Sequence, residues 1–251
     1  MRAGMILIVV FGGLLVFAGL GGMEGLRQAL IAVTAQRGDD GNGAVPSNAV
    51  RYRLDFTVRV DGKPITGSKV YQIALKSGGG DGSTEVARVT ERFLGEAITI
   101  RLPGRPTLIA LLATPEHGVE GFRNLFDTAC GFSFGADESV SSFIGRVTSF
   151  RGSCPVPATS MPQVLSISDR NDARTLALAD YRGLSRSFGT GVEFVSASIS
   201  TSEEPVSTGI IDELPWLKLQ PGQEVDIHGT YLLNKIDIGI YLSRSMFIAR
   251  A

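Results

Sequence analysis

The chain contains only two cysteines, Cys130 and Cys154, and they carry the clearest chemical signal in the sequence. Between them lies an irregular segment rich in Gly, Ser and Phe. Outside the cytoplasm a lone cysteine pair usually forms a disulfide, and closing such a loop contributes about 3 kcal/mol by restricting the unfolded chain. Their spacing is not that of a Cys-x-x-Cys redox pair. The sequence therefore predicts a structural Cys130–Cys154 disulfide, with two free thiols as the alternative.

The other residue types that commonly catalyse reactions or bind metals form no recognisable pattern in this sequence. His117 and His228 are the only histidines, and only Asp226 shares a predicted strand face with His228. Most metal sites need three or four ligands. Ser68 stands beside Lys69, but neighbouring residues of a strand face opposite ways. Motifs of serine hydrolases, zinc proteases and P-loops are missing from the sequence, so we predict no catalytic residue, no metal site and no cofactor.

Four residues are candidates for contact with a partner. Arg51, Arg53 and Arg59 alternate with apolar residues, so they form a basic stripe along one face of a predicted strand, with Asp55 among them. Such a stripe can contact anionic lipid headgroups or an acidic protein, or it can be a solvated outer face. Trp216 is the single tryptophan, a residue type found both at interface centres and in cores.

The N-terminal segment of the sequence predicts where in the cell the protein lies. No charged residue occurs from Ala3 to Met23, and residues 5–20 are almost wholly apolar. About 20 residues of helix span roughly 30 Å, the thickness of bilayer hydrocarbon. The sequence predicts that residues 1–35 form a single-pass signal anchor with a short extension. A cleaved signal peptide and a buried core helix are the alternatives. Arg2 on the N-terminal side predicts that the remainder lies outside the cytoplasm.

Composition and patterning describe the rest of the chain. Residues 36–48 are polar and rich in glycine, which is typical of a flexible linker. Residues 49–251 are predicted to form one β-rich domain. With 43% hydrophobic residues this chain is not disordered, and a net charge of -1 lacks the basic excess of nucleic-acid-binding proteins. The strict alternation from Val50 to Val60 predicts a strand with one buried face, followed by a turn at Asp61 and Gly62.

The remaining elements are mostly short strands. They are predicted at residues 69–75, 85–93, 96–102, 107–113, 163–168, 175–179, 192–200, 225–228 and 236–242. A helix is predicted to begin at Thr114 and Pro115 and to end before Cys130, and a second, capped by Asp180, spans residues 181–188. Residues 131–157 are predicted to be an irregular excursion. The fold class is mainly β with a few short helices, as a β-sandwich or an open-barrel-like domain.

Three blocks of sequence carry a resemblance. They are Tyr52-Arg53-Leu54 with residues 66–70, Gly95-Glu96-Ala97 leading into residues 108–112, and residues 180–194 with 206–210 and 214–217. Together they resemble an uncharacterised family of proteobacterial proteins, often with an N-terminal apolar segment. The resemblance implies a bacterial envelope setting, and so a single-pass inner-membrane protein that faces the periplasm. It implies no activity and no functional residues.

These observations predict a function of binding more than of catalysis. We expect a single-pass membrane-anchored envelope protein whose β-rich domain binds a protein partner or supports a membrane assembly, and which does not bind nucleic acid. An extracytoplasmic hydrolase or carbohydrate-active enzyme with a loop-built site is one alternative, and an accessory subunit of a larger membrane complex is another. A deep pocket with convergent carboxylates or a Ser/His pair favours the enzyme. An exposed apolar patch at Trp216 or in residues 131–157 favours binding.

Overall fold

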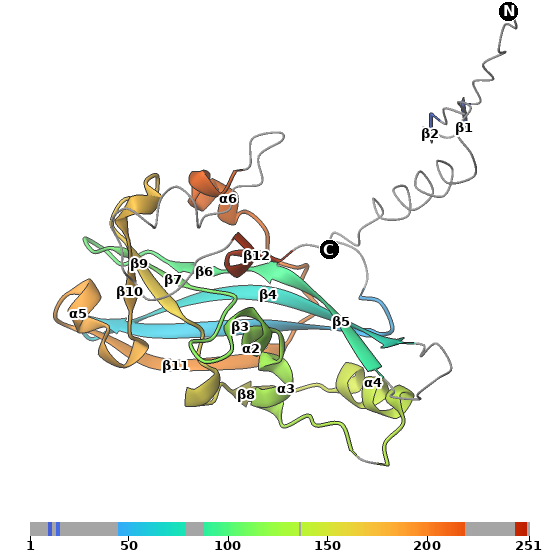
Figure 1. Cartoon of the computed structure of the whole chain (residues 1–251). Helices are drawn as coiled ribbons and strands as arrows, with labels where there is room; N and C mark the ends of the chain where they lie inside the picture. The colour runs from blue at the N-terminus through green and yellow to red at the C-terminus, as the bar shows by residue number, and fades with distance from the viewer. Residues whose placement is uncertain are drawn as a thin grey trace, which may run out of the picture. The chain divides into compact units, whose positions relative to one another are not determined.

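The computed structural model describes residues 10–11, 14–15, 45–78, 88–135, 137–218 and 244–249 (Figure 1). The chain divides after Asp39 into two units. In the first unit, β1 (Val10–Phe11) pairs antiparallel with β2 (Leu14–Leu15), so these four residues are extended where the sequence predicts a helix. The rest of the predicted anchor and most of the predicted linker lie outside the described residues. Among the residues described, no helix has the length and apolar run that crossing a bilayer requires.

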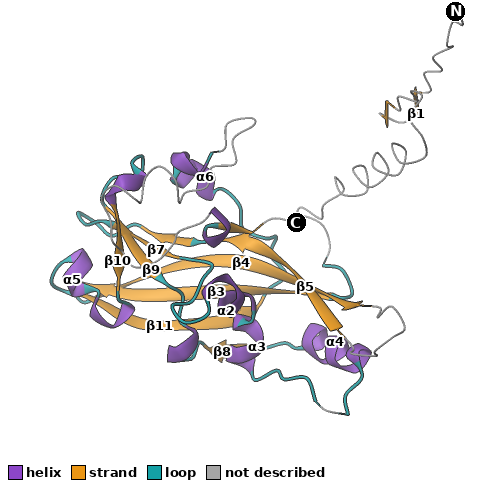
Figure 2. Ribbon diagram, viewed as in Figure 1, coloured by secondary structure: helices purple, strands orange, loops and turns teal. Residues whose placement is uncertain are grey.

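The second unit is built on two antiparallel sheets (Figure 2), which confirms the mainly β class. The larger sheet has the strand order β12 (Ile248–Ala249), β5 (Arg88–Glu96), β4 (Lys63–Gly78), β3 (Ala49–Val60), β11 (Val192–Thr201) and β8 (Ser153–Pro155). The smaller sheet has the order β10 (Leu176–Ala179), β9 (Val164–Ile167), β7 (Thr107–Ala110) and β6 (Ile98–Ile100).

Short helices connect these strands. The α-helices are α2 (Gly118–Arg123), α3 (Leu125–Cys130), α4 (Val140–Ser149), α5 (Ser185–Phe188) and α6 (Ile210–Glu213). Single 3₁₀ turns lie at η1 (Ala158–Ser160), η2 (Ala173–Thr175), η3 (Tyr181–Gly183), η4 (Pro215–Leu217) and η5 (Arg244–Met246). The predicted strands at 225–228 and 236–242 lie outside the described residues.

The β3–β4 hairpin is the centre of the larger sheet. Asp61 and Gly62 both have positive φ, 49° and 84°, which is the geometry of the two-residue turns that join twisted strands. Along β3 the alternating residues from Val50 to Val60 are buried, as the pattern predicts. On β4 the partner of Tyr52 is Tyr71, so two aromatic rings enter the core side by side, 5.3 Å apart.

The two central strands of the smaller sheet, β7 and β9, are buried on both faces. One face shares a continuous inner core with the larger sheet and with helices α2 to α4. The other face carries an outer core, which residues 210–217 and Phe247 cover. Every residue of β7 and β9 is buried, which explains why their sequences are short continuous apolar runs without alternation.

One helix prediction needs correction, and a second is confirmed. The helix after β7 begins at Gly118, because Thr114 instead pairs with Gly118 and accepts a hydrogen bond from the backbone N–H of His117. It is also divided at Asn124 into α2 and α3. The helix capped by Asp180 is confirmed as η3 followed by α5, because the Asp180 side chain accepts from Arg182 N.

The predicted excursion at residues 131–157 contains regular structure. It holds α4, whose first turn is capped by Ser139 at Ser142 N, and the strand β8. The sequence of α4 hides the helix because three serines, a threonine and a glycine have low helix propensity. Its apolar residues nevertheless fall on one face, and Phe143 and Val147 reach the inner core.

Candidate functional site

A disulfide fixes the segment that we treat as the candidate site. Cys130 ends α3 and Cys154 lies in β8, and their sulfur atoms are bonded, with Cα atoms 5.3 Å apart. Gly131 follows α3 in the left-handed conformation and turns the chain out of the helix. The predicted pairing is therefore present in the structure. We call residues 131–153, which this bond closes into a loop, the stapled segment.

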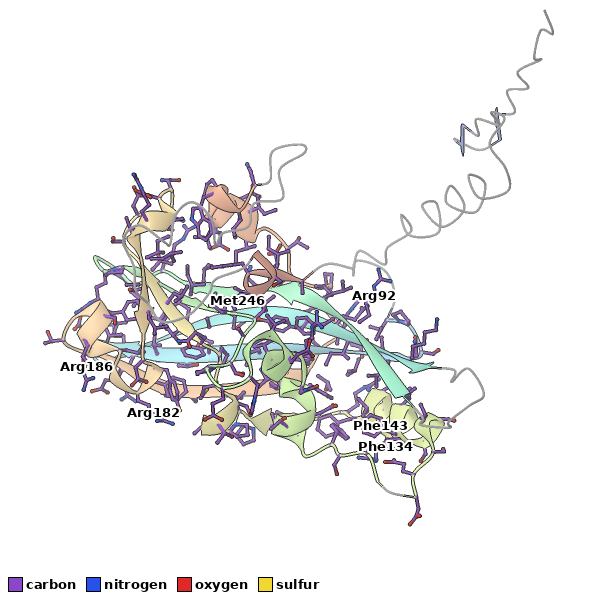
Figure 3. The ribbon with its side chains drawn as sticks, in the orientation of Figure 1. Arg92, Phe134, Phe143, Arg182, Arg186 and Met246 are labelled. Carbon is purple, nitrogen blue, oxygen red and sulfur yellow. A yellow bond between two sulfur atoms is a disulfide. The ribbon has the colours of Figure 1, made fainter. Side chains whose placement is uncertain are left out.

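Aromatic rings form the underside of the stapled segment. Phe132 and Phe150 pack edge to face at 5.4 Å, and both rings contact the buried Phe126 of α3. Phe143 of α4 is buried, and Phe134 packs against it at 5.5 Å (Figure 3). Phe134 is nevertheless 45% exposed, the highest value among the large hydrophobic residues described as exposed. The ring of Phe134 is thus partly exposed to solvent and packs on its other side against buried aromatic rings.

Arg146 holds the loop beside Phe134 in place. Its guanidinium donates to both carboxylate oxygens of Glu138, at 2.7 and 3.1 Å, and to the carbonyl oxygen of Ser133 at 2.9 Å. It also lies over the rings of Phe132 and Phe143, with its central carbon 5.5 and 5.3 Å from their centroids. The hydrogen bonds from Arg146 and from Gly135 N hold the pKa of Glu138 below its usual value.

A half-buried carboxyl group lies near this pair. Burial raises the pKa of Asp127 in α3 to about 6, while the positive charge of Arg146 opposes part of that rise. Arg146 is already engaged by Glu138 in two direct hydrogen bonds. Asp127 therefore changes protonation near pH 6 at the base of the stapled segment.

This arrangement has the composition of a contact surface. An exposed aromatic ring beside an ordered arginine is the composition that protein interfaces favour. Among the residues that the structure describes, no three histidines, cysteines or acidic residues gather to hold a metal ion. Ser68 donates to Asp55, and Lys69 lies on the other face of β4, beside Glu96 and Glu213.

Arg53 and Arg59 of the predicted basic stripe fit the alternative of a solvated outer face with partly paired charges, whereas Arg51 does not lie in solvent. Arg51 is buried, only 4% exposed, and donates from Nε to Gln72. Arg53 pairs with Asp55 and Glu204, and Arg59 pairs with Glu193. The sequence shows the arginines of one strand but not the carboxylates that β11 and the chain after it bring alongside.

Trp216 contributes to the outer core and is half-buried. Its ring meets Phe247 edge to face at 5.3 Å, and its Nε1 is buried without a hydrogen-bond partner among the described residues. The structure therefore gives Trp216 a packing role in the outer core. His117 lies at the surface with a side chain that is 72% exposed, and His228 and Asp226 lie outside the described residues.

The sequence does not predict a buried polar cluster that Glu96, Lys69 and Glu213 form. Glu96 is 2% exposed, accepts a hydrogen bond from Ile210 N at 2.8 Å, and lies 3.9 Å from Lys69 Nζ. Glu213 lies 3.7 Å from the same Nζ and accepts from the hydroxyl of Thr99. The cluster joins residues more than a hundred positions apart in the sequence, so no local pattern could reveal it. It fastens α6 to the sheets.

Comparisons with known proteins add no further assignment. No family model matches the sequence, and no curated protein or solved structure is similar to it. The resemblance to proteobacterial envelope proteins therefore stays a prediction.

Proposed function

We propose that this protein is a membrane-anchored binding protein of the bacterial envelope. In this proposal the apolar N-terminal segment holds the chain in the inner membrane. A β-sandwich domain in the periplasm then presents the stapled segment to a protein partner. The observation that carries the proposal is Phe134, which is 45% exposed on a segment closed by the Cys130–Cys154 disulfide.

The physical support lies in how the ring is held. The ring of an exposed phenylalanine is apolar. Burying it against a partner therefore contributes about 25 cal/mol per Å² of apolar surface removed from water. The disulfide, the hydrogen bonds of Arg146 and the packing on Phe143 order the segment before any partner arrives. Pre-ordering lowers the entropy lost on binding. The disulfide also fits an oxidising compartment such as the periplasm.

The enzyme alternative has weaker support. Two hollows of about 320 and 430 Å³ share Glu116 and Thr159 in their walls. The acidic and imidazole groups around them are Glu116, His117, Glu120 and Asp180. The first three have side chains 66%, 72% and 72% exposed, and Asp180 is exposed as well. Groups so open to water are poorly suited to the convergent, partly desolvated arrangement that catalysis needs.

Site-specific photo-cross-linking tests the binding surface. A photoreactive phenylalanine analogue at position 134, in the full chain in its native cells, is expected to give a discrete protein adduct on irradiation. Val195 and Leu178 are matched controls, because they are exposed by 39% and 38% and lie on other elements. Equal adducts at all three positions, or none at 134, would contradict the proposal.

Extraction tests the anchor separately. The full chain is expected to remain in the membrane pellet after an alkaline carbonate wash. Replacing Leu14 and Leu15 by arginine should release it, because each charge at the bilayer centre costs about 2.5–3.5 kcal/mol on insertion scales. Val195→Arg adds a charge to the domain surface and should leave the protein in the pellet. Release of the unaltered chain would remove the anchor from the proposal.

A further inference from the structure

A hollow of about 430 Å³ is lined by residues of α2, α3, η1 and the chain between β7 and α2. Apart from Gly121, each described residue in its walls carries a hydroxyl, an amide, a carboxylate or an imidazole group. Gly121, Asn124 and Thr128 are spaced three and four positions apart, which places them on one side of the helical segment. The volume lies in the range of about 300–1,000 Å³ that is usual for small-molecule sites. We call it the polar hollow.

Two buried hydroxyl groups form the floor of the polar hollow. Thr114 is 4% exposed and Ser160 is 8% exposed, although both line the hollow. Thr114 Oγ1 accepts a hydrogen bond from His117 N at 3.3 Å. The hydroxyl of Ser160 has no hydrogen-bond partner among the described residues. A hydroxyl that is largely removed from water is stabilised by a partner, so a molecule in the hollow gains by bonding to Ser160.

The rim of the polar hollow offers both donors and acceptors. Asn124 precedes α3, where an asparagine side chain usually caps the helix, but its amide makes no capping bond here. Glu120 accepts from Arg123 at 2.8 Å, and the carboxylate of Glu116 lies 3.9 Å from the imidazole of His117. An amide donates and accepts, and a carboxylate accepts. This mixture suits the hydroxyl groups of a ligand, because each hydroxyl also donates and accepts.

A second hollow, of about 320 Å³, shares Glu116 and Thr159 with the polar hollow, so the two are neighbours. We call it the apolar hollow, because most of the side chains in its walls are apolar, among them Pro115, Pro162, Val164 and Leu178. Leu178 is 38% exposed, so part of its apolar surface is open to a ligand. Asp180 and Arg182 also line this hollow, and the guanidinium of Arg182 lies over the neighbouring tyrosine ring.

We propose that the two hollows together bind an oligosaccharide of N-acetylated amino sugars. The ring hydroxyls bond to Ser160, Asn124 and the carboxylates of the polar hollow. The methyl group of an acetamido substituent packs on Leu178 in the apolar hollow. Such a sugar presents many hydroxyls and an apolar methyl group side by side, as the two neighbouring hollows require. Phe134 lines neither hollow, so the inference stands without a protein partner there.

Titration calorimetry on the full chain in an uncharged polyoxyethylene detergent tests the site, because that detergent contains no sugar. The probes are chitotriose, a β-linked trisaccharide of N-acetylglucosamine, and cellotriose, which has the same linkage but hydroxyls in place of the acetamido groups. Chitotriose is expected to bind saturably. Cellotriose should bind about fourfold more weakly, which is the contribution of one buried methyl group. Absence of saturable heat with chitotriose, or equal binding of the two sugars, would overturn the proposal.

Two variants assign the binding to the two hollows. Asn124→Ala should weaken chitotriose binding about fivefold, the loss of one hydrogen bond. Its Tm should stay within a few degrees of the unaltered chain, because this side chain caps no helix. Leu178→Asn should abolish the preference for chitotriose over cellotriose.

The matched controls are Asn171→Ala and Val195→Asn. Both change exposed residues that line neither hollow, so both variants should bind as the unaltered chain does. Unchanged binding by Asn124→Ala, or an unchanged preference for chitotriose in Leu178→Asn, would contradict the proposed site.

Discussion

The ring of Tyr71 covers the backbone of Gly95. Tyr71 lies on β4 and Gly95 on the neighbouring β5, and a Cβ atom on Gly95 would overlap the tyrosine ring. The ring is wedged in turn between Phe93 and Phe122, with centroids 5.7 and 5.5 Å away. The missing side chain of Gly95 therefore leaves the space that the Tyr71 ring fills. Gly95 lies inside β5, although the sequence predicts that this strand ends at residue 93.

Replacing Gly95 by alanine should destabilise the domain by about 1–3 kcal/mol, because the ring cannot move without displacing its neighbours. The unfolding free energy from urea titration measures the effect. Gly145→Ala is the control, since a Cβ at that position of α4 meets nothing within 4 Å. Alanine there should stabilise the helix slightly. Equal effects of the two substitutions would contradict the packing argument.

Reduction of the disulfide should lower the stability of the domain. The bond joins residues 24 positions apart, and opening a loop of that length costs about 3 kcal/mol in the chain-entropy model. Thermal unfolding of Cys130→Ser/Cys154→Ser against the unaltered chain measures the loss. Intact mass of the non-reduced protein checks the bond directly. Two free thiols in protein purified from membranes would show that the pair is not oxidised in the cell.

The protonation of Asp127 should give stability a pH dependence. Its pKa is about 6 in the folded state, against about 4 in an unfolded chain. The folded state thus binds the extra proton, so this contribution is fully present below about pH 4 and is lost as pH rises through 6. Asp127→Asn should flatten the fall between pH 4 and 6 and raise the stability at pH 7.5 by on the order of 2 kcal/mol.

Urea titrations at a series of pH values measure this slope. Thr128→Ala is the control, because it changes an exposed neighbour on the same helix without removing a titratable group. It should keep the slope of the unaltered chain. An unchanged slope in Asp127→Asn would assign the pH dependence to another group.

Loss of Lys69 should loosen α6. Lys69→Met removes the cation beside the buried Glu96, and an unpaired buried charge costs about 3–5 kcal/mol. Because Glu96 also accepts from Ile210 N, hydrogen exchange should accelerate at residues 210–214. Lys63→Met, at the exposed start of the same strand, should change neither measurement. Equal exchange in the two variants would show that the ion pair does not fasten the helix.

Local patterns predicted the parts of the fold that depend on neighbours in sequence. The alternation of β3, its turn at Asp61 and Gly62, and the helix cap at Asp180 are all confirmed. The start of β4 at Lys63 was missed, because Thr66, Gly67 and Ser68 have the composition of a loop. Residues 63–68 form a strand because they pair with β3, and not because of their own β-propensity.

The candidate site was only partly predictable. The two cysteines pointed to the stapled segment, but the layer of rings under Phe134 depends on α4, which the serine-rich sequence concealed. Arg51 was expected in solvent because it alternates with buried residues. The structure buries it, and its Nε donates to Gln72 of β4. The alternation of a strand predicts on which face of the sheet a side chain lies. It does not predict whether other parts of the chain cover that face.

The outer core brings together segments that are synthesised far apart in time. Phe247 and Ile248 pack on Ala97 and Leu165, and β12 completes the edge of the larger sheet beside β5. Before residues 247–249 are synthesised, residues 210–217 can cover the outer core of the smaller sheet only without Phe247 and Ile248. The outer core and the β12 edge of the larger sheet can therefore be completed only after residues 247–249 have been synthesised.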